Sequence, residues 1–277
     1  MIGQSKSPPA HREYPDAGPA GMNFAAGGSG AFDVPGTTTL RRQVQHFAKL
    51  VRDGDIKEED LAGRSVTLVA VSGNDYTKVF AGVSCVTTNL SSIQQTSVPH
   101  LTAYLQITAA LVENVTAEIV ANVARLQDLG VEKVLVNNLY PLGCAPSRTR
   151  QNKYASCDKH ANQVARIHNH QLTDKLAGMD GVLVLDLSAA FFKIVGSHPD
   201  GDMTNLFPNR LVPCCESMDP MGYCGQVVWD SAEPLYKVCD NPDSYFFWDD
   251  MNPTEVGWEA VMGPLSRPIS DFLELRR

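Results

Sequence analysis

Short apolar runs and longer amphipathic stretches alternate along most of this 277-residue chain. Runs of β-branched residues and leucine predict buried strands at 66–71, 133–139 and 182–187. Apolar residues at helical spacing predict the helices between and around them, at 37–52, 99–129, 158–176, 189–195 and 253–273. This alternation predicts an α/β fold with a parallel sheet covered by helices on both faces, and a site at the carboxyl ends of the strands.

Two stretches lack this pattern. Residues 1–20 are polar and rich in proline, and residues 196–244 show no clear period. A long aperiodic stretch inside a compact domain is unusual unless it is functional or cross-linked. We therefore expect an irregular segment over 1–20 and a single domain over 21–277.

Charge and hydropathy exclude some partners. The net charge of −8 and the pI near 5.3 argue against a nucleic-acid or anionic-membrane partner. No apolar run approaches the roughly 20 residues of a membrane span, so no transmembrane segment is expected. Residues 1–20 contain no apolar leader of a signal peptide.

Cysteine usage indicates an oxidising compartment. No Cys-x-x-Cys pair occurs and no histidine follows the late cysteines, so disulfides are favoured over a metal site. We therefore expect no metal site. The sequons at Asn89 and Asn114 are candidate glycosylation sites and agree weakly with secretion. Because a leader is absent, we expect the natural N-terminus to lie upstream. The seven cysteines are at 85, 144, 157, 214, 215, 224 and 239.

Several segments, taken in order, resemble one enzyme family. Residues 21–30 read GMNFAAGGSG, 71–76 read VSGNDY, 138–146 read NLYPLGCAP, and the late cysteines lead to YFFWDDMNPTE at 245–255. These segments resemble the signature blocks N-F-A-x-G-G-x-G, G-x-N-D, N-L-P-P-L-G-C-x-P and W-D-x-x-H-P-T-E of the plant GDSL esterase/lipases, which are SGNH hydrolases. The resemblance implies a three-layer α/β/α SGNH-hydrolase fold.

The resemblance also assigns roles to four residues. The backbone N–H of Gly28 and the side-chain amide of Asn74 match the family's oxyanion donors. Asp249 matches the acid of the Ser-His-Asp triad, and Asn252 occupies the position of the triad histidine. An amide cannot take up a proton near neutral pH, so Asn252 cannot serve as the general base.

The family's first block, F-G-D-S-x-x-D-T-G-N, holds the nucleophilic serine. Nothing in residues 1–20 resembles it, since Ser5 and Ser7 lack the flanking residues. We therefore expect the nucleophile, the first strand and the first helix to be absent from this chain.

Each of these residues also has a structural interpretation. Gly28 suits a tight turn, Asn74 could bond its own turn, and Asp249 could be a local hydrogen-bond acceptor. Asn252, followed by Pro253 and by Glu255, is typical of a helix N-cap with a capping box. The histidines in helical patterns, at 46, 160, 168 and 170, are expected on the surface or in packing.

The family resemblance leads to one function and two alternatives. We expect a GDSL-type carboxylic-ester hydrolase for lipid or acylated-polysaccharide esters, catalytically impaired in this chain. The alternatives are a non-catalytic protein that binds acyl or glycan ligands, and an acyltransferase. We expect no cofactor, a small-molecule or polysaccharide ester as partner, a monomer, and the secretion typical of the family. We also expect Cys144 to pair with Cys157, Cys239 with Cys214 or Cys215, Cys224 with the other of these two, and Cys85 to stay unpaired.

Overall fold

The computed structural model describes residues 7–11, 21–32, 36–63, 65–71, 73–77, 98–197, 199, 201–219 and 222–275. The chain divides into two compact units, each built from separate stretches. Unit 1 comprises Met1–Leu139, Ile167–Leu185 and Ile269–Arg277, and unit 2 comprises Tyr140–Arg166 and Asp186–Pro268. A single domain over 21–277 stays a prediction.

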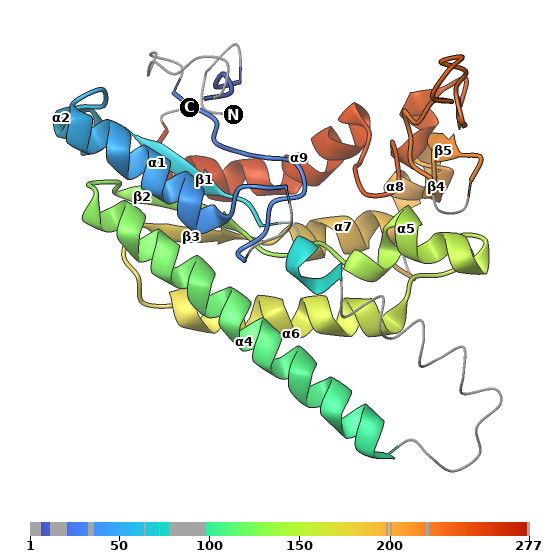
Figure 1. Cartoon of the computed structure of the whole chain (residues 1–277), viewed down its shortest axis with the longest axis horizontal. Coiled ribbons are helices and arrows are strands. Elements are labelled where there is room, and N and C mark those ends of the chain that lie inside the picture. The colour runs from blue at the N-terminus through green and yellow to red at the C-terminus, as the bar shows by residue number, and fades with distance from the viewer. Residues whose placement is uncertain are drawn as a thin grey trace. The chain divides into compact units, whose positions relative to one another are not determined.

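Unit 1 contains the predicted parallel sheet (Figure 1). Its strands are β1 (Val66–Val69), β2 (Lys133–Asn137) and β3 (Val182–Leu185), in the order β1-β2-β3. All three begin at the predicted residue and end two residues before the predicted end. β3 ends early because Asp186 caps α7, and β2 ends early because the turn after it is fixed by the Asn169 side chain. Its oxygen accepts the N–H of Leu139 at 2.7 Å, and its amide donates to the Leu139 carbonyl at 2.8 Å.

Helices α1 (Leu40–Asp53) and α4 (Val98–Asp128) contact each other in unit 1, and Figure 1 shows them side by side. Thr39 caps α1, since its hydroxyl accepts the N–H of Arg42. The Arg41 guanidinium joins the two helices by donating to the largely buried Glu118 carboxylate, with Nε 2.8 Å from Oε1. Unit 1 also contains α2 (Glu58–Leu61) and the 3₁₀ turn η1 (Asn74–Tyr76).

The Leu105–Asp128 part of α4 is long and apolar enough to cross a membrane by length and composition alone. This segment is therefore an exception to the expectation that no segment approaches a membrane span. In unit 1, however, 44% of an apolar 18-residue window of this segment is buried. It holds Glu118, and Lys175 of α6 (Lys159–Leu176) lies 2.8 Å from Glu113. These contacts are those of a core helix, which passes the same length and composition test.

Unit 2 surrounds an aromatic core. Phe191 of α7 (Leu187–Val195) stacks on Tyr140 with ring centroids 5.0 Å apart and meets Phe246 edge-on at 5.3 Å. Phe246 in turn contacts Phe207 and Phe247. These rings are almost fully buried, and Phe207 is the one among them that comes from the aperiodic stretch.

The other elements of unit 2 are short. β4 and β7 pair in parallel, and β5 and β6 pair antiparallel. The N-terminal part of α6 and most of α9 also belong to this unit. The bounds are η2 (Leu142–Cys144), α5 (Pro146–Thr149), η3 (Arg150–Asn152), α8 (Gly201–Leu206), β4 (Asn209–Pro213), β5 (Cys215–Ser217), β6 (Tyr236–Val238), η4 (Pro242–Ser244), β7 (Tyr245–Phe247) and α9 (Glu255–Phe272).

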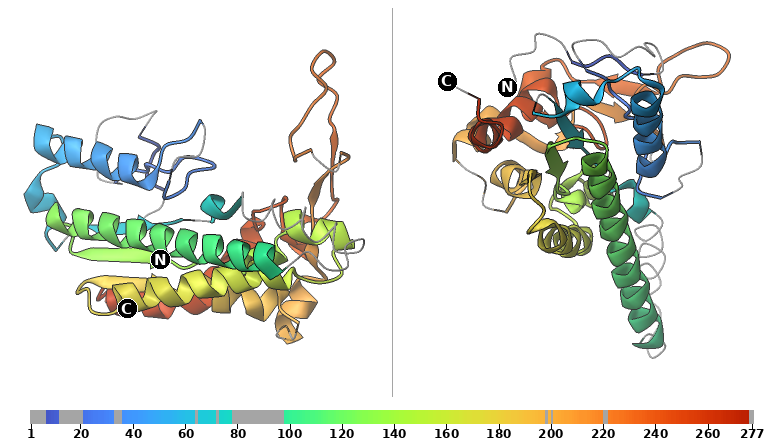
Figure 2. Two further views of the ribbon diagram at one scale, coloured as in Figure 1. Left: turned by 60° about the horizontal axis from the view of Figure 1, so that its bottom comes forward. Right: turned by 90° about the vertical axis from the view of Figure 1, so that its left-hand side faces the viewer.

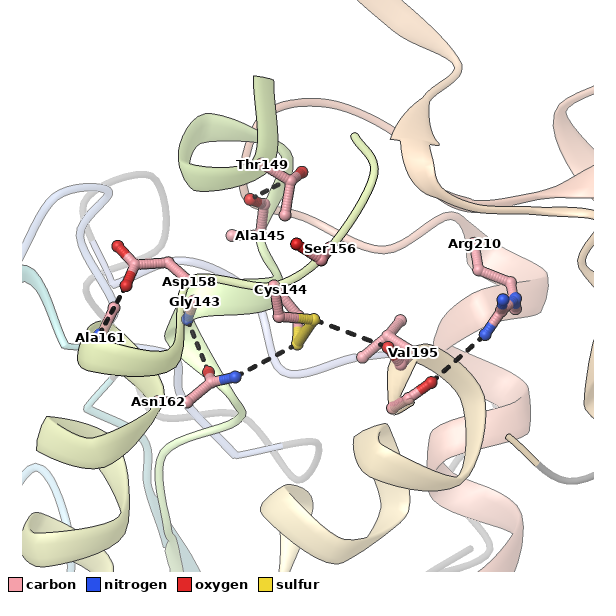
Figure 3. Close-up of a disulfide and its surroundings, with 12 residues drawn as sticks. Gly143, Cys144, Ala145, Thr149, Ser156, Asp158, Ala161, Asn162, Val195 and Arg210 are labelled. Atoms are coloured by element: carbon pink, nitrogen blue, oxygen red, sulfur yellow. Dashed lines mark hydrogen bonds between the residues drawn. A yellow bond between two sulfur atoms is a disulfide. The ribbon is translucent and has the colours of Figure 1, made fainter. Parts of the chain in front are cut away.

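Three disulfides confirm the predicted pairing. Cys144 bonds Cys157, with Cα atoms 4.3 Å apart (Figure 3). Cys214 bonds Cys239 and Cys215 bonds Cys224, at Cα separations of 4.9 and 5.6 Å. The last two cross-link residues within the stretch that shows no period. Cys85 and Asn89 lie outside the described residues.

The predicted start of the last helix is wrong. α9 begins at Glu255, and its cap is Thr254, whose hydroxyl accepts the Gly257 N–H at 3.0 Å. Asn252 does not cap the helix, because its side chain is used by Asp249. Asn252 and Thr254 are both suitable cap residues, and the sequence alone does not decide which of them caps the helix.

We predict that Gly143→Ala destabilises unit 2. An added Cβ would lie 2.0 Å from the Asp158 carbonyl oxygen, and the Gly143 N–H already bonds Asn162 at 2.8 Å (Figure 3). The backbone would have to move, at a cost of about 3 kcal/mol. Urea unfolding under non-reducing conditions measures this. Gly201→Ala is the control, because nothing lies within 4 Å of its added Cβ, and equal stability of the two variants would contradict the prediction.

Candidate active site

The Gly28 loop forms a tight turn in unit 1. The Ser29 N–H bonds the Ala26 carbonyl at 3.0 Å, and Gly28 has φ of 74° at the third position of this turn. A positive φ there is strained for any residue with a Cβ. The turn interpretation of Gly28 is therefore correct, and it is compatible with a backbone N–H that acts as an oxyanion donor.

Asn74 holds its own loop against the glycine loop. Its side-chain amide donates to the Ser29 carbonyl at 2.8 Å, across 45 positions of sequence. The neighbouring Asp75 carboxylate accepts the N–H groups of Ala31 and Phe32 at 3.0 and 2.9 Å. The structure thus brings together the two segments from which the sequence predicted oxyanion donors, just after the end of β1.

Glycine at position 30 is required for this contact. A Cβ on Gly30 would lie 2.7 Å from an Asp75 carboxylate oxygen. The glycine-rich block therefore serves two purposes, a positive φ at Gly28 and a close approach at Gly30.

Asp249 and Asn252 form a pair in unit 2. The Asn252 side-chain amide donates to both Asp249 carboxylate oxygens, at 3.1 and 3.0 Å. The same carboxylate accepts the backbone N–H groups of Asn252 at 2.7 Å and of Met251 at 2.9 Å. The interpretation of Asp249 as a local acceptor is therefore correct. The pair also reproduces the hydrogen bond by which a triad acid orients a histidine.

The loop that carries this pair is anchored by its neighbours. The Arg150 guanidinium lies 2.9 Å from the Asp250 carboxylate, and the Ser147 N–H bonds the Asp250 carbonyl at 3.0 Å. Burial raises the pKa of Asp250, Arg150 opposes this shift, and the charge of Asp249 adds to it. The loop that carries the Asp249 and Asp250 carboxylates is thereby anchored by the Arg150 guanidinium.

Two tyrosines complete these surroundings. Burial raises the pKa of Tyr140, and the negative charge of Asp249 raises it further, so the phenol stays neutral. Burial and a hydrogen bond to Glu216 raise the pKa of Tyr154 to about 12, and Arg150 opposes this. Tyr140 stands where the family block has proline, so the sequence alone marks this position as a departure from the family pattern. The Arg150–Asp250 contact joins residues a hundred positions apart, and no local sequence motif indicates it.

His168 is the buried histidine among those expected on the surface or in packing. It is only 1% exposed, and its Nδ1 lies 2.7 Å from the Tyr76 hydroxyl in unit 1. Burial, and to a lesser extent the charge of Lys175, lowers its pKa to about 4. Its position inside the core excludes contact with a substrate, so His168 is a packing residue and not a substitute base.

The remaining predicted positions add little. Asn114 is exposed on α4, which suits a glycosylation acceptor but does not show one. Within the described residues, no group of three or more metal-binding side chains occurs. Gly28 and Asn74 belong to unit 1, whereas Asp249 and Asn252 belong to unit 2, so the convergence of the two pairs stays a prediction.

Comparison with known proteins gives a consistent picture. The sequence profile of the GDSL-like Lipase/Acylhydrolase family matches residues 10–263. The chain is 32% identical over 91% of its length to GDSL esterase/lipase At5g03610 of Arabidopsis thaliana, covering 67% of that protein. It is 30% identical over 89% of its length to GDSL esterase/lipase At3g09930 of the same plant, covering 66% of it. The chain thus spans about two thirds of the length of these relatives.

Proposed function

Because the chain belongs to the GDSL-like lipase/acylhydrolase family, we propose that it is a carboxylic-ester hydrolase whose proton-transfer step is impaired. Its substrates are esters of lipids or of acylated polysaccharide. The three-layer α/β architecture of the family fits the parallel sheet and helices of unit 1. The four residues with assigned roles act as two oxyanion donors, an acid and an amide in place of the base.

The observation that carries the proposal is the Asp249–Asn252 pair. The Asn252 amide donates to Asp249 as a histidine N–H would, at 3.0 Å. A histidine has a second ring nitrogen that takes the proton of the attacking group, whereas a carboxamide nitrogen has no available lone pair. The loop is therefore preorganised for ester hydrolysis but lacks the atom that accepts the proton. Loss of a general base costs about 10²–10⁴ in rate.

The same pair supports the second candidate, a protein that binds acyl or glycan esters without turnover. The two candidates share the binding step and differ in residual catalysis. An acyltransferase ranks last, because it needs the serine and the base as much as a hydrolase does. The three disulfides support an oxidising, secreted location for any of the three.

We predict that this chain hydrolyses p-nitrophenyl butyrate no faster than its Asp249→Ala variant. Residues 1–277 contain no Gly-Asp-Ser motif, and Asn252 cannot take up a proton, so Asp249 has no catalytic step to support. Steady-state and stopped-flow release of nitrophenol measure this. A burst stoichiometric with protein in the unmodified chain would refute the impairment, because a burst requires a working nucleophile and base.

A further inference from the structure

The segment Cys214–Cys239 of unit 2, here the cysteine hairpin, exposes an unusual number of large apolar side chains. Trp229 is 100% exposed and Tyr223 is 63% exposed. Met218, Val227 and Val238 are each about half exposed in the same hairpin. A tryptophan in contact with nothing is rare in a folded protein, since its large apolar area is costly to leave in water. Exposed apolar groups gathered in one short segment point to an interaction site.

The described part of the hairpin, residues 214–219 and 222–239, is held by its own bonds. Its ends are joined by the Cys214–Cys239 disulfide, and Cys215–Cys224 closes a second loop inside it. β5 and β6 pair from Cys215↔Val238 to Ser217↔Tyr236. Figure 2 shows the stretch between them as a narrow extended loop, drawn in orange.

Trp229 lies in the tip of this loop. The Val228 N–H bonds the Glu233 carbonyl at 2.9 Å, and the Ala232 N–H bonds the Val228 carbonyl at 3.0 Å. The tip is thus a closed turn whose backbone is ordered before any binding. Preorganisation of this kind lowers the entropy lost on association.

The charges on the hairpin narrow the choice of partner. Asp219, Asp230 and Glu233 are exposed, and Lys237 is the hairpin's single basic residue. A negative hairpin is repelled by an anionic lipid surface. It is attracted to an outward-facing quaternary ammonium, which both carboxylates and aromatic faces recognise. Two copies of the hairpin would bring like charges together, so self-association through it is disfavoured.

We propose that the cysteine hairpin docks the protein on a zwitterionic, choline-bearing phospholipid surface, with Trp229 inserted at the headgroup level. Tryptophan and tyrosine favour this layer because their rings are apolar while their N–H and O–H groups bond water or headgroups. The proposal rests on lipid esters being the substrates, and it gives an ester hydrolase a means of meeting substrate in a bilayer. Binding needs no turnover, so it holds for an impaired enzyme as well.

Vesicle flotation tests the proposal. The unmodified chain should float with phosphatidylcholine vesicles, and Trp229→Ala should weaken partitioning about tenfold, since one large aromatic stays in water. Phe192→Ala is the matched control, because Phe192 is a 42% exposed aromatic of unit 2 outside the hairpin, and it should bind as the unmodified chain does. Trp229→Ala removes no contact, so its thermal unfolding should be unchanged.

The lipid headgroup and the assembly state of the protein supply further tests. Phosphatidylglycerol vesicles at low salt should bind several-fold more weakly than phosphatidylcholine vesicles. Equal flotation of Trp229→Ala and the unmodified chain, or stronger binding to phosphatidylglycerol, would overturn the proposal. So would sedimentation showing, without lipid, a dimer that Trp229→Ala dissolves, since the occupant would then be a second copy. None of these results depends on ester hydrolysis, so a failure here is separate from a failure of the proposed enzymatic function.

Discussion

Asn252→His should raise ester hydrolysis by about 10²–10⁴ when the chain is fused at its N-terminus to a family first block with its strand, helix and serine. The reason is local. Asn252 is exposed, and its amide already bonds Asp249 at 3.0 Å. An imidazole can therefore replace it without a buried clash, bond Asp249 through one nitrogen, and present the other to the serine. The measurement is kcat/KM for p-nitrophenyl butyrate.

The substitution alone should do little in the unfused chain. A base without the serine can activate only water, and the Ser N–H that would complete the oxyanion hole is also lacking there. The fused chain without Asn252→His should likewise remain slow. Triad members act as a unit, so the two changes together should exceed the product of their separate effects. A fused chain that is already fast with Asn252 would show that another residue serves as the base.

His168 should make the folded protein acid-sensitive between about pH 6.5 and pH 4. Its pKa is about 4 in the folded protein, whereas an unfolded histidine titrates near 6.5. In this window the unfolded chain binds the proton and the folded chain does not. Stability is therefore fully present above pH 6.5 and is lost as pH falls through the window, by up to about 3 kcal/mol. Urea unfolding at stepped pH measures this loss.

His168→Gln should remove most of this pH dependence, while lowering stability at pH 7 through the lost contact with Tyr76. His170→Gln is the matched control on the same helix, since the His170 side chain is 77% exposed, and it should retain the full acid sensitivity. Identical pH profiles for His168→Gln and the unmodified chain would show that other groups cause the loss. The paired carboxylates of Glu118 and Asp158, whose pKa values are lowered, act mainly below this window.

The fold was predictable where a single period dominates. Valine and leucine dominate the three strand runs, and their parallel pairing followed from the helices between them. The helix starts were less accurate. α9 begins two residues later than predicted, because Asp249 occupies the Asn252 side chain and Thr254 makes the cap instead. Propensity alone cannot indicate which of two adjacent polar residues is already engaged.

The site was predictable only as far as local motifs reach. The Gly28 turn and the Asp249–Asn252 pair are local, and sequence blocks located both. The Tyr76–His168 contact spans 92 positions and depends on how η1 packs on α6, so nothing in the sequence indicated it. The exposure of Trp229 could not be predicted for a different reason. The sequence shows that a tryptophan follows two valines, but only the disulfide-bonded hairpin shows that it is fully exposed.

The central claim is that the Asp249–Asn252 pair is a triad lacking its base. A double-mutant cycle in the fused chain tests it most directly, comparing kcat/KM with and without Asn252→His and with and without Asp249→Ala. With Asn252 present, Asp249→Ala should leave the rate unchanged, because the acid has no imidazole to orient. After Asn252→His, the same Asp249→Ala change should lower the rate by at least about 10². Equal effects of Asp249→Ala in both backgrounds would contradict the account, because Asp249 would then act independently of position 252.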